Sequence, residues 1–430
     1  MSNLVPFRLG IAGAGTVGGA VVRLLLERGD TLAQRAGRPL VITAIATRSP
    51  EKLKDLSLQN IHVLTNPLDL ASLPDVDAVV EVIGGAEGTA KSLVETSLKA
   101  GKHVITANKA LLAHHGHDLA VLAENNKVNL TFEAAVAGGV PILKALREGA
   151  VANTIFRIFG ILNGTCNYIL TKSQKTGLSF ADILKEAQHL GYAEADPAAD
   201  VDGLDTGHKL SILASLAFSS RISFEHVRIS GIRALEPIDH HYAAELGYAV
   251  KLLGYAEHRN GTILQRVSPF FVPLSLAIGH VEDVFNAVVL EGDAVGQIMI
   301  QGRGAGGMPT ASAVLADIVD IASGRSASPF GIKTSLLHPS SQSPDFHSEF
   351  YLRLSVAEKP GIVAAVASIL AENSISIKTL QQRSNDDAAT VPLLLTTHTI
   401  PESAVDKALA AIINAKLIAS PPLAIPLLTE

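Results

Sequence analysis

A short stretch in the middle of the chain concentrates acidic side chains around one lysine. Asp205 and Lys209 stand four residues apart at the start of an apolar run, 210–218. If this run is a helix, the two side chains share one face of its first turns. As a surface pair they would stabilise that helix by only about 0.2–0.5 kcal/mol. An ammonium beside a carboxylate can instead bind a charged substrate and move a proton, so the spacing favours catalysis.

The residues before this helix supply more carboxylates. Pro197 and Gly203 interrupt the segment, so we expect Glu194 to lie on a separate loop that folds back over the helix face. Together with Asp200 and Asp205, it is a candidate for binding a cationic group of a substrate. The alternative is a solvated acidic loop, which is the usual meaning of such a composition.

A glycine motif near the N-terminus predicts a nucleotide site. The apolar run 7–12 reads as a buried strand, and a helical pattern begins at Val17. Between them the spacing Gly-x-Gly-x-x-Gly makes a tight turn, lets the backbone approach a pyrophosphate and packs the helix on the strand. The helix N-terminus then faces the phosphates. The candidate cofactor-binding residues here are Gly13, Gly15, Thr16, Val17 and Gly18.

The second predicted strand, 40–46, ends at Arg48. A fold selective for NAD places an acid at this position to bind the ribose 2′-hydroxyl, whereas an arginine suits a 2′-phosphate. The sequence therefore favours NADP, with NAD as the alternative. Arg48 as an ordinary surface residue is the competing interpretation.

Further apolar runs at 61–64, 78–83, 103–106 and 129–133 predict the parallel sheet of an α/β domain. Ligands of such sheets bind beyond the carboxyl ends of the strands. Two strand ends carry suitable residues. Gly84 would let a flat ring approach the backbone, and Lys109 follows the tip of the run 103–106.

The overall composition excludes several classes of protein. With 430 residues, 47% of them apolar, the chain can form two or three domains. A net charge of −6 and the absence of a Lys/Arg-rich run give no support to nucleic-acid binding. No apolar stretch is long enough to span a bilayer, and the first residues lack a signal-peptide layout. A single cysteine, Cys166, excludes an intramolecular disulfide. We expect a cytoplasmic protein that does not bind membranes.

The order of several motifs resembles homoserine dehydrogenases of the long bacterial type, which carry a C-terminal ACT domain. The resemblance covers essentially the whole chain and is much more specific than one glycine pattern. Besides the glycine motif and the acidic stretch, it is carried by the segments 106–111 (TANKAL), 132–142 (FEAAVAGGVPI), 160–165 (GILNGT) and 304–310 (GAGGMPT).

This resemblance implies reversible, nicotinamide-linked interconversion of L-aspartate 4-semialdehyde and L-homoserine, on the route to threonine and methionine. It implies that Lys209 is the general acid/base, that Asp205 binds substrate and supports this lysine, and that Glu194 also binds substrate. Lys109 would lie at the nicotinamide end of the site. Backbone close to the cofactor would come from Gly191, Gly304, Gly306 and Gly307.

The resemblance also implies a structural sodium ion. Its ligands would be backbone carbonyls in the small-residue loop that begins at Glu133, at positions Val136, Gly138 and Val140. From the residues alone, a plain crossover loop is the competing interpretation.

The tail, 349–430, shows a βαββαβ order with Lys-Pro-Gly at the first turn and resembles an ACT domain. Such modules pair across chains and bind amino acids where the first strand meets the first helix, which maps to Glu358, Gly361 and Ser376. We expect L-threonine to inhibit here, and a chain ending near Ser348 to stay active but insensitive. The family often has Asp or Asn at 358, so Glu358 leaves open another amino acid or a pure oligomer contact.

We therefore expect an α/β protein in three domains. A Rossmann-type NAD(P)-binding domain spans 1–135, an α+β catalytic and dimerisation domain 136–334, and a ferredoxin-like ACT domain 349–430, after a linker at 335–348. The helix 310–321, begun by Pro309, can pack back on the first domain. The resemblance implies a homodimer or homotetramer.

Two rival functions remain at this point. A semialdehyde dehydrogenase that forms an acyl-cysteine would need Cys166 to be activated by a base, and no base is identifiable. A non-catalytic sensor of NADP and amino acids would not need Lys109 and Lys209.

Overall fold

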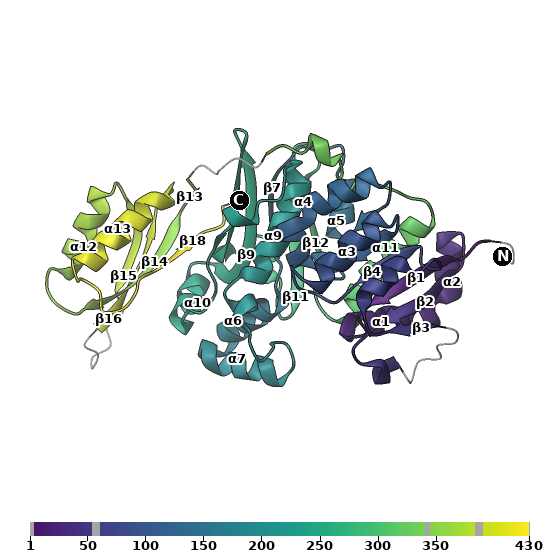
Figure 1. Ribbon diagram of the computed structural model, residues 1–430. Coiled ribbons are helices and arrows are strands. Elements are labelled where there is room, and N and C mark those ends of the chain that lie inside the picture. Colours follow the sequence, from purple (N-terminus) through teal and green to yellow (C-terminus); the bar gives the residue numbers. More distant parts are fainter. Residues whose placement is uncertain (1–3, 54–60, 340–344, 383–389, 430) are drawn as a thin grey trace.

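The computed structural model describes residues 4–53, 61–339, 345–382 and 390–429. The N-terminal part and the C-terminal part lie at opposite ends of an elongated molecule, with the central domain between them (Figure 1). Each part is built on its own main sheet.

The first domain is a parallel sheet with strand order β3-β2-β1-β4-β5-β6, which is the arrangement of a dinucleotide-binding fold. Its central strands are buried on both faces, which is why they read as continuous apolar runs. The strands are β1 (Phe7–Ala12), β2 (Leu40–Ala46), β3 (His62–Leu64), β4 (Ala78–Glu81), β5 (His103–Thr106) and β6 (Leu130–Thr131). The helices are α1 (Thr16–Glu27), α2 (Gly29–Ala36), α3 (Thr89–Lys99) and α4 (Lys109–Asn125).

The central domain is built on a mostly antiparallel sheet with order β12-β11-β7-β9-β10-β8. The helix α9 (Leu204–Phe218) lies against β7, β9 and α4 and is buried along nearly its whole length. The strands are β7 (Ile155–Ile161), β8 (Arg228–Ile229), β9 (Tyr248–Arg259), β10 (Thr262–Pro273), β11 (Phe285–Gly292) and β12 (Gly296–Arg303). The other helices are α5 (Ile142–Lys144), α6 (Gly164–Thr176), α7 (Phe180–His189), α8 (Ala198–Val201) and α10 (Pro237–Glu245).

The chain then returns to the first domain. Helix α11 (Gly307–Ala322) packs against α1, and Val314 and Ile318 lie in the same apolar core as Val21 and Val22. This helix begins at Gly307, so the prediction that Pro309 begins it was wrong. Pro309 lies in the first turn, where a missing N–H breaks no hydrogen bond within the helix.

The C-terminal domain is a four-stranded antiparallel sheet of order β15-β16-β14-β18, with α12 and α13 covering one face (Figure 1). This confirms the predicted βαββαβ order. The main elements are β14 (Phe350–Ala357), α12 (Ile362–Glu372), β15 (Ile377–Gln382), β16 (Thr390–Thr397), α13 (Glu402–Asn414) and β18 (Leu423–Pro426), and β13 (His347–Ser348) pairs with β17 (Ile400–Pro401).

The C-terminal domain is not an independent body, because it shares an apolar core with the central sheet. Phe346 packs its ring against Tyr255 and Phe270 of that sheet. Beyond β18, the Leu428 amide donates to the Phe271 carbonyl at 2.8 Å. Within the predicted linker, 340–344 lie outside the described residues, and Leu337 on the other side is buried.

Some predicted strands are shorter or shifted. The run 129–133 pairs only at Leu130–Thr131, because the chain turns into a 3₁₀ segment at Glu133–Ala135. The run 78–83 leaves the sheet after Glu81, whose carboxylate binds the amides that follow it. The second strand of the βαββαβ order begins at Ile377, and the chain turns just before it at Ser374, which adopts a positive φ of 60°.

Candidate active site

Helix α9 presents Asp205 and Lys209 on one face, as the four-residue spacing predicted. Gly203, with φ of 88°, turns the chain so that the helix begins directly after α8. The Lys209 Nζ donates to Asp205 Oδ2 at 2.6 Å and to the Leu162 carbonyl at 2.7 Å. Both side chains are about nine-tenths buried. The lysine is therefore held by two acceptors in a position with little water.

A second ammonium lies on the other side of the same carboxylate. Lys109, at the start of α4 in the first domain, is 3.1 Å from Asp205 Oδ1. Burial alone would raise the pKa of Asp205, but the charges of Lys209 and Lys109 outweigh burial and hold the pKa below its ordinary value. The pKa of Lys109 is raised, chiefly by the charge of Asp205. Asp205 is thus a permanent anion that joins the two domains.

Asn163 completes this cluster and was missed by the sequence argument. Its Nδ2 donates to Asp200 Oδ1 at 2.7 Å and to Asp205 Oδ2 at 2.9 Å. Burial raises the pKa of Asp200, partly offset by the bond from Asn163 and reinforced by the charge of Asp205. The motif 160–165 carried the resemblance, but no pattern in the sequence pointed to an amide between two acids.

Glu194 and Gly191 lie on the exposed loop between α7 and α8, as the interruption by Pro197 predicted. The side chain of Gln188 donates to the carbonyls of Glu194 and Ala195 and ties the loop to α7. The negative charge of Glu194 contributes to the raised pKa of Lys109, but less than the charges of Asp205 and Asp200.

The glycine motif lines a cavity of about 600 Å³ beyond the carboxyl ends of β1, β2 and β4. A side chain at Gly18 would lie 1.9 Å from the Gly13 carbonyl oxygen, so the third glycine is required for the turn to pack on the helix. A side chain at Gly15 would meet nothing within 4 Å, which leaves its backbone open to a phosphate. Arg48 is exposed and lines the same cavity.

Buried polar contacts hold the loop after β4, which lines the same cavity through Val82 and Ile83. The buried Glu81 carboxylate accepts from the amides of Ile83 and Gly84 at 2.8 and 3.0 Å and from the Thr106 hydroxyl at 2.5 Å. Asn108 then donates to the Gly85 carbonyl at 2.7 Å. Sequence reasoning singled out Gly84 but missed Glu81, because an acid within an apolar run gives no hint of its partners.

The glycine turn at 304–307 lies where two domains meet. A side chain at Gly138 would come within 2.3 Å of the Gly304 carbonyl oxygen, and one at Gly307 within 2.8 Å of the Thr16 carbonyl oxygen. Gly306 adopts a φ of 111° between them. The turn therefore contacts both the loop 136–140 and the start of α1.

The loop that begins at Glu133 is sharply bent, with positive φ at Ala137 and Gly138. The Glu133 carboxylate accepts from the Leu143 and Lys144 amides at 3.0 and 2.9 Å, so its side chain caps α5. Burial, and then the charge of Asp317, raise the pKa of Glu133 to about 7. Among the described residues, no group of three His, Cys, Asp or Glu side chains is placed to bind a metal.

Cys166 cannot serve the acyl-cysteine chemistry of the first rival. It is fully buried, and its thiol donates to the Asp200 carbonyl at 3.2 Å. Burial and the nearby carboxylates raise the pKa of this thiol well above its usual value.

The predicted effector residues lie in the C-terminal domain, away from the Asp205 cluster. Glu358, Gly361 and Ser376 are exposed on the C-terminal domain, and Gly361, with φ of 89°, caps α12.

Three family models match the chain in order. They are described as the homoserine dehydrogenase NAD-binding domain, matching residues 13–133, homoserine dehydrogenase, matching 141–319, and the ACT domain, matching 350–414. A homoserine dehydrogenase from Neisseria gonorrhoeae is 41% identical over 418 residues, which is 95% of each chain. The chain belongs to the homoserine dehydrogenase family.

Solved structures of homoserine dehydrogenases agree with this membership. One from Thiobacillus denitrificans is 40% identical, has a TM-score of 0.93 and covers 99% of each chain. A hyperthermophilic archaeal homoserine dehydrogenase in complex with NADPH is 27% identical, has a TM-score of 0.65 and covers 76% of this chain and 100% of its own. The protein is therefore an oxidoreductase with a nicotinamide-binding domain, and the predicted family, fold and ACT domain are confirmed. Among the described helices, none has the length and apolar character to cross a membrane.

Proposed function

We propose that this homoserine dehydrogenase uses Lys209 as the proton donor when L-aspartate 4-semialdehyde is reduced to L-homoserine. The observation that carries the proposal is the buried Asp205 carboxylate, which contacts Lys209 and Lys109 from two domains at 2.6 and 3.1 Å. A nicotinamide cofactor supplies the hydride when it is bound. The protein must then deliver a proton to the oxygen that becomes the alcohol.

Each member of the cluster has a separate task in this proposal. Lys209 donates its proton to the developing alkoxide and stabilises the charge in a poorly hydrated site. Asp205 orients Lys209, and its second oxygen holds Lys109 at the cofactor side. Glu194 and Asp200 bind the ammonium group of the substrate. In the reverse direction Lys209 accepts the proton of the alcohol.

The residues around the nucleotide cavity fit a dinucleotide. Gly13, Gly15 and Gly18, with Thr16 and Val17 at the start of α1, would hold the pyrophosphate. Gly84, Gly191 and the turn containing Gly304, Gly306 and Gly307 would border the cofactor. Arg48 at the exposed rim supports NADP over NAD, because a guanidinium pairs with a 2′-phosphate in a bidentate manner.

Three further roles belong to the same proposal. Sodium would bind the carbonyls of Val136, Gly138 and Val140 near Glu133, in the loop bent by its two positive φ angles. L-Threonine would inhibit at the ACT face formed by Glu358, Gly361 and Ser376. The protein would act as a homodimer or homotetramer, with domains at 1–135, 136–334 and 349–430.

One experiment separates the proposed function from its rivals. NADPH consumption is followed with L-aspartate 4-semialdehyde in the absence of phosphate, and the product is identified chromatographically. Formation of L-homoserine supports the proposal. Activity that requires phosphate and reduces NADP⁺ would identify an acyl-transfer dehydrogenase, and cofactor binding without turnover would identify a sensor.

A further inference from the structure

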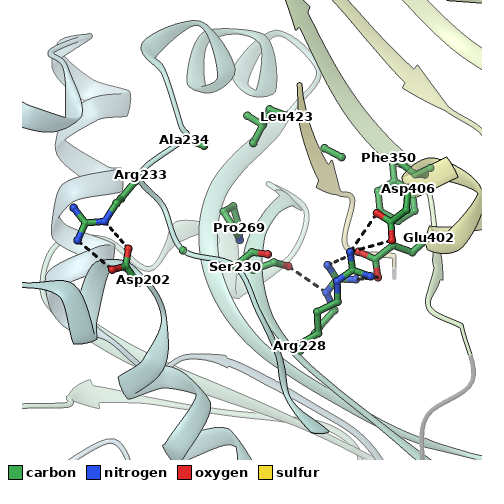
Figure 2. Close-up of a pocket in the computed structure, with 15 residues that line it drawn as sticks. Asp202, Arg228, Ser230, Arg233, Ala234, Pro269, Phe350, Glu402, Asp406 and Leu423 are labelled. Carbon is green, nitrogen blue, oxygen red and sulfur yellow. Dashed lines mark hydrogen bonds and ion pairs between the residues drawn. The ribbon is translucent and has the colours of Figure 1, made fainter. Parts of the chain in front are cut away.

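The cavity at the seam between the central domain and the ACT domain has its charges satisfied within the protein. Figure 2 shows Arg233 bound to Asp202 at one end. At the other end Arg228 is bound to both Glu402 and Asp406. Three arginines and three carboxylates line this cavity, so their charges cancel. A second cavity, in the first domain, has unpaired charge beside an apolar surface.

This second cavity is a groove of about 710 Å³ between α2 and α11, with the end of α1 in its lining. The three helices lie together at the N-terminal end of the molecule (Figure 1). None of Lys109, Asp205 and Lys209 lines the groove, and neither does the glycine motif of the cofactor cavity. The groove is therefore separate from both proposed sites. Its apolar lining includes Leu24, Leu32, Met308, Leu315 and Val319.

Two helical faces border the groove. Arg28, Leu32 and Arg35 follow the spacing i, i+4, i+7 at α2, which puts them on one face. Along α11 the lining positions 308, 312, 315, 316 and 319 repeat in the same way. With a rise of about 1.5 Å per residue, the stretch from 308 to 319 is roughly 16 Å long. The groove therefore suits an elongated ligand.

The charged residues around the groove leave positive charge without a partner. Asp320 already contacts two cations, Lys144 and Arg325. Among the described residues, neither Arg28 nor Arg35 forms an ion pair or a side-chain hydrogen bond, and both are exposed. A guanidinium binds a carboxylate through two parallel hydrogen bonds, so these two arginines complement an anionic group.

The apolar part of the groove is open to solvent. Met308 is 44% exposed, although its neighbours Leu315 and Val319 on the same face are buried. Exposed apolar surface rimmed by polar residues is typical of binding sites. The volume lies within the range of small-molecule sites, about 300–1,000 Å³, whereas a stable protein partner covers about 800 Å² of surface. The size therefore favours a small molecule.

We propose that this groove, which we call the α2–α11 groove, binds a medium-chain aliphatic carboxylate. The carboxylate of the ligand pairs with the guanidinium groups of Arg28 and Arg35. Its chain lies along the apolar face of α11 between Met308 and Val319. The proposal does not depend on the catalytic roles assigned to Lys209 and its neighbours, because the groove shares no residue with that cluster.

Calorimetric titration of the full-length protein with decanoate tests the chain and the charge together. We expect saturable binding to wild type. Butanoate, which lacks six of the methylene groups, should bind at least about a hundredfold more weakly, because each buried methylene strengthens binding roughly fourfold. Decyltrimethylammonium, which has the same chain and the opposite charge, should not bind.

Two variants, each with a matched control, locate the binding. Arg28→Gln combined with Arg35→Gln should raise the Kd for decanoate at least tenfold, whereas Arg23→Gln, at an exposed arginine of α1 outside the groove, should not change it. Ser312→Trp fills the groove from an exposed position of α11 and should remove binding. Ser92→Trp, at an exposed position of α3, should not. Thermal unfolding shows that each variant is folded.

Three results would overturn the proposal. The first is the absence of saturable decanoate binding, which is also expected if a second copy of the chain covers the groove. The second is binding that persists unchanged in either groove variant, because the ligand then occupies another site. The third is sedimentation with phosphatidylglycerol vesicles without binding of free decanoate, which would identify a membrane contact.

Discussion

Replacing Lys209 by alanine tests the centre of the proposed mechanism. The substitution removes the ammonium that lies 2.6 Å from Asp205 and 2.7 Å from the Leu162 carbonyl. Loss of a general acid lowers turnover by about 10²–10⁴-fold, which corresponds to roughly 3–5.5 kcal/mol in the barrier. Lys109 is bound to the other oxygen of Asp205 and is 42% exposed, so it is poorly placed to replace the lost donor. We therefore expect the loss to lie in the upper half of this range.

The same substitution has a limited structural cost. Asp205 keeps its bonds to Lys109 and Asn163, and the main loss is an unpaired Leu162 carbonyl in a buried position. An unsatisfied buried acceptor costs about 1–3 kcal/mol. The variant should therefore fold, with a lower melting temperature, and should bind NADPH with nearly unchanged affinity.

The assay compares kcat, KM for L-aspartate 4-semialdehyde and the Kd for NADPH in wild type, Lys209→Ala and Lys209→Arg. Arginine keeps the charge but does not release its proton near neutral pH, so Lys209→Arg should restore stability and not turnover. Added methylammonium should recover part of the activity of Lys209→Ala and should not recover that of Lys209→Arg. Turnover of Lys209→Ala within about threefold of wild type would refute the assignment, because the loss of a general acid is far larger than that.

Four further predictions address the cofactor, the buried acid and the ACT domain. Arg48→Ala should raise the KM for NADPH and leave that for NADH nearly unchanged, and equal effects on both would contradict a contact with the 2′-phosphate. The pKa of Glu133 is raised to about 7. The contribution of the protonated Glu133 to the free energy of unfolding is therefore complete below about pH 4.5 and is lost as the pH rises through 7, a change of about 3 kcal/mol. Urea unfolding at several pH values should show this pH dependence of the free energy of unfolding in wild type and not in Glu133→Gln. L-Threonine should inhibit wild type and not Ser376→Arg, as measured by NADPH consumption, and equal inhibition of both would exclude the ACT face. A chain ending at Ser348 should aggregate instead of remaining active, because removal of residues 349–430 uncovers Phe271 of the central sheet, whose ring stacks on Tyr351 with the centroids 4.7 Å apart. A soluble, active fragment in gel filtration would show that this contact is dispensable.

The sequence determined those features that depend on neighbouring residues. The glycine motif between strand and helix predicted the nucleotide site, because turn, phosphate approach and helix start are all local. The four-residue spacing of Asp205 and Lys209 predicted a shared helix face for the same reason. The order of apolar runs predicted a Rossmann-type domain and a βαββαβ tail, and both were confirmed.

The tertiary structure decided the contacts between residues far apart in the chain. Lys109 and Asp205 are nearly a hundred positions apart, and only the packing of α4 on α9 brings their charges to 3.1 Å. Asn163 and Glu81 owe their roles to partners on other elements. The tail was expected to be separable, yet Tyr351 stacks on Phe271 and the Leu428 amide donates to the Phe271 carbonyl, which joins the tail to the central sheet. Such long-range burial leaves no periodic signal, because it depends on which surfaces meet after each element has formed.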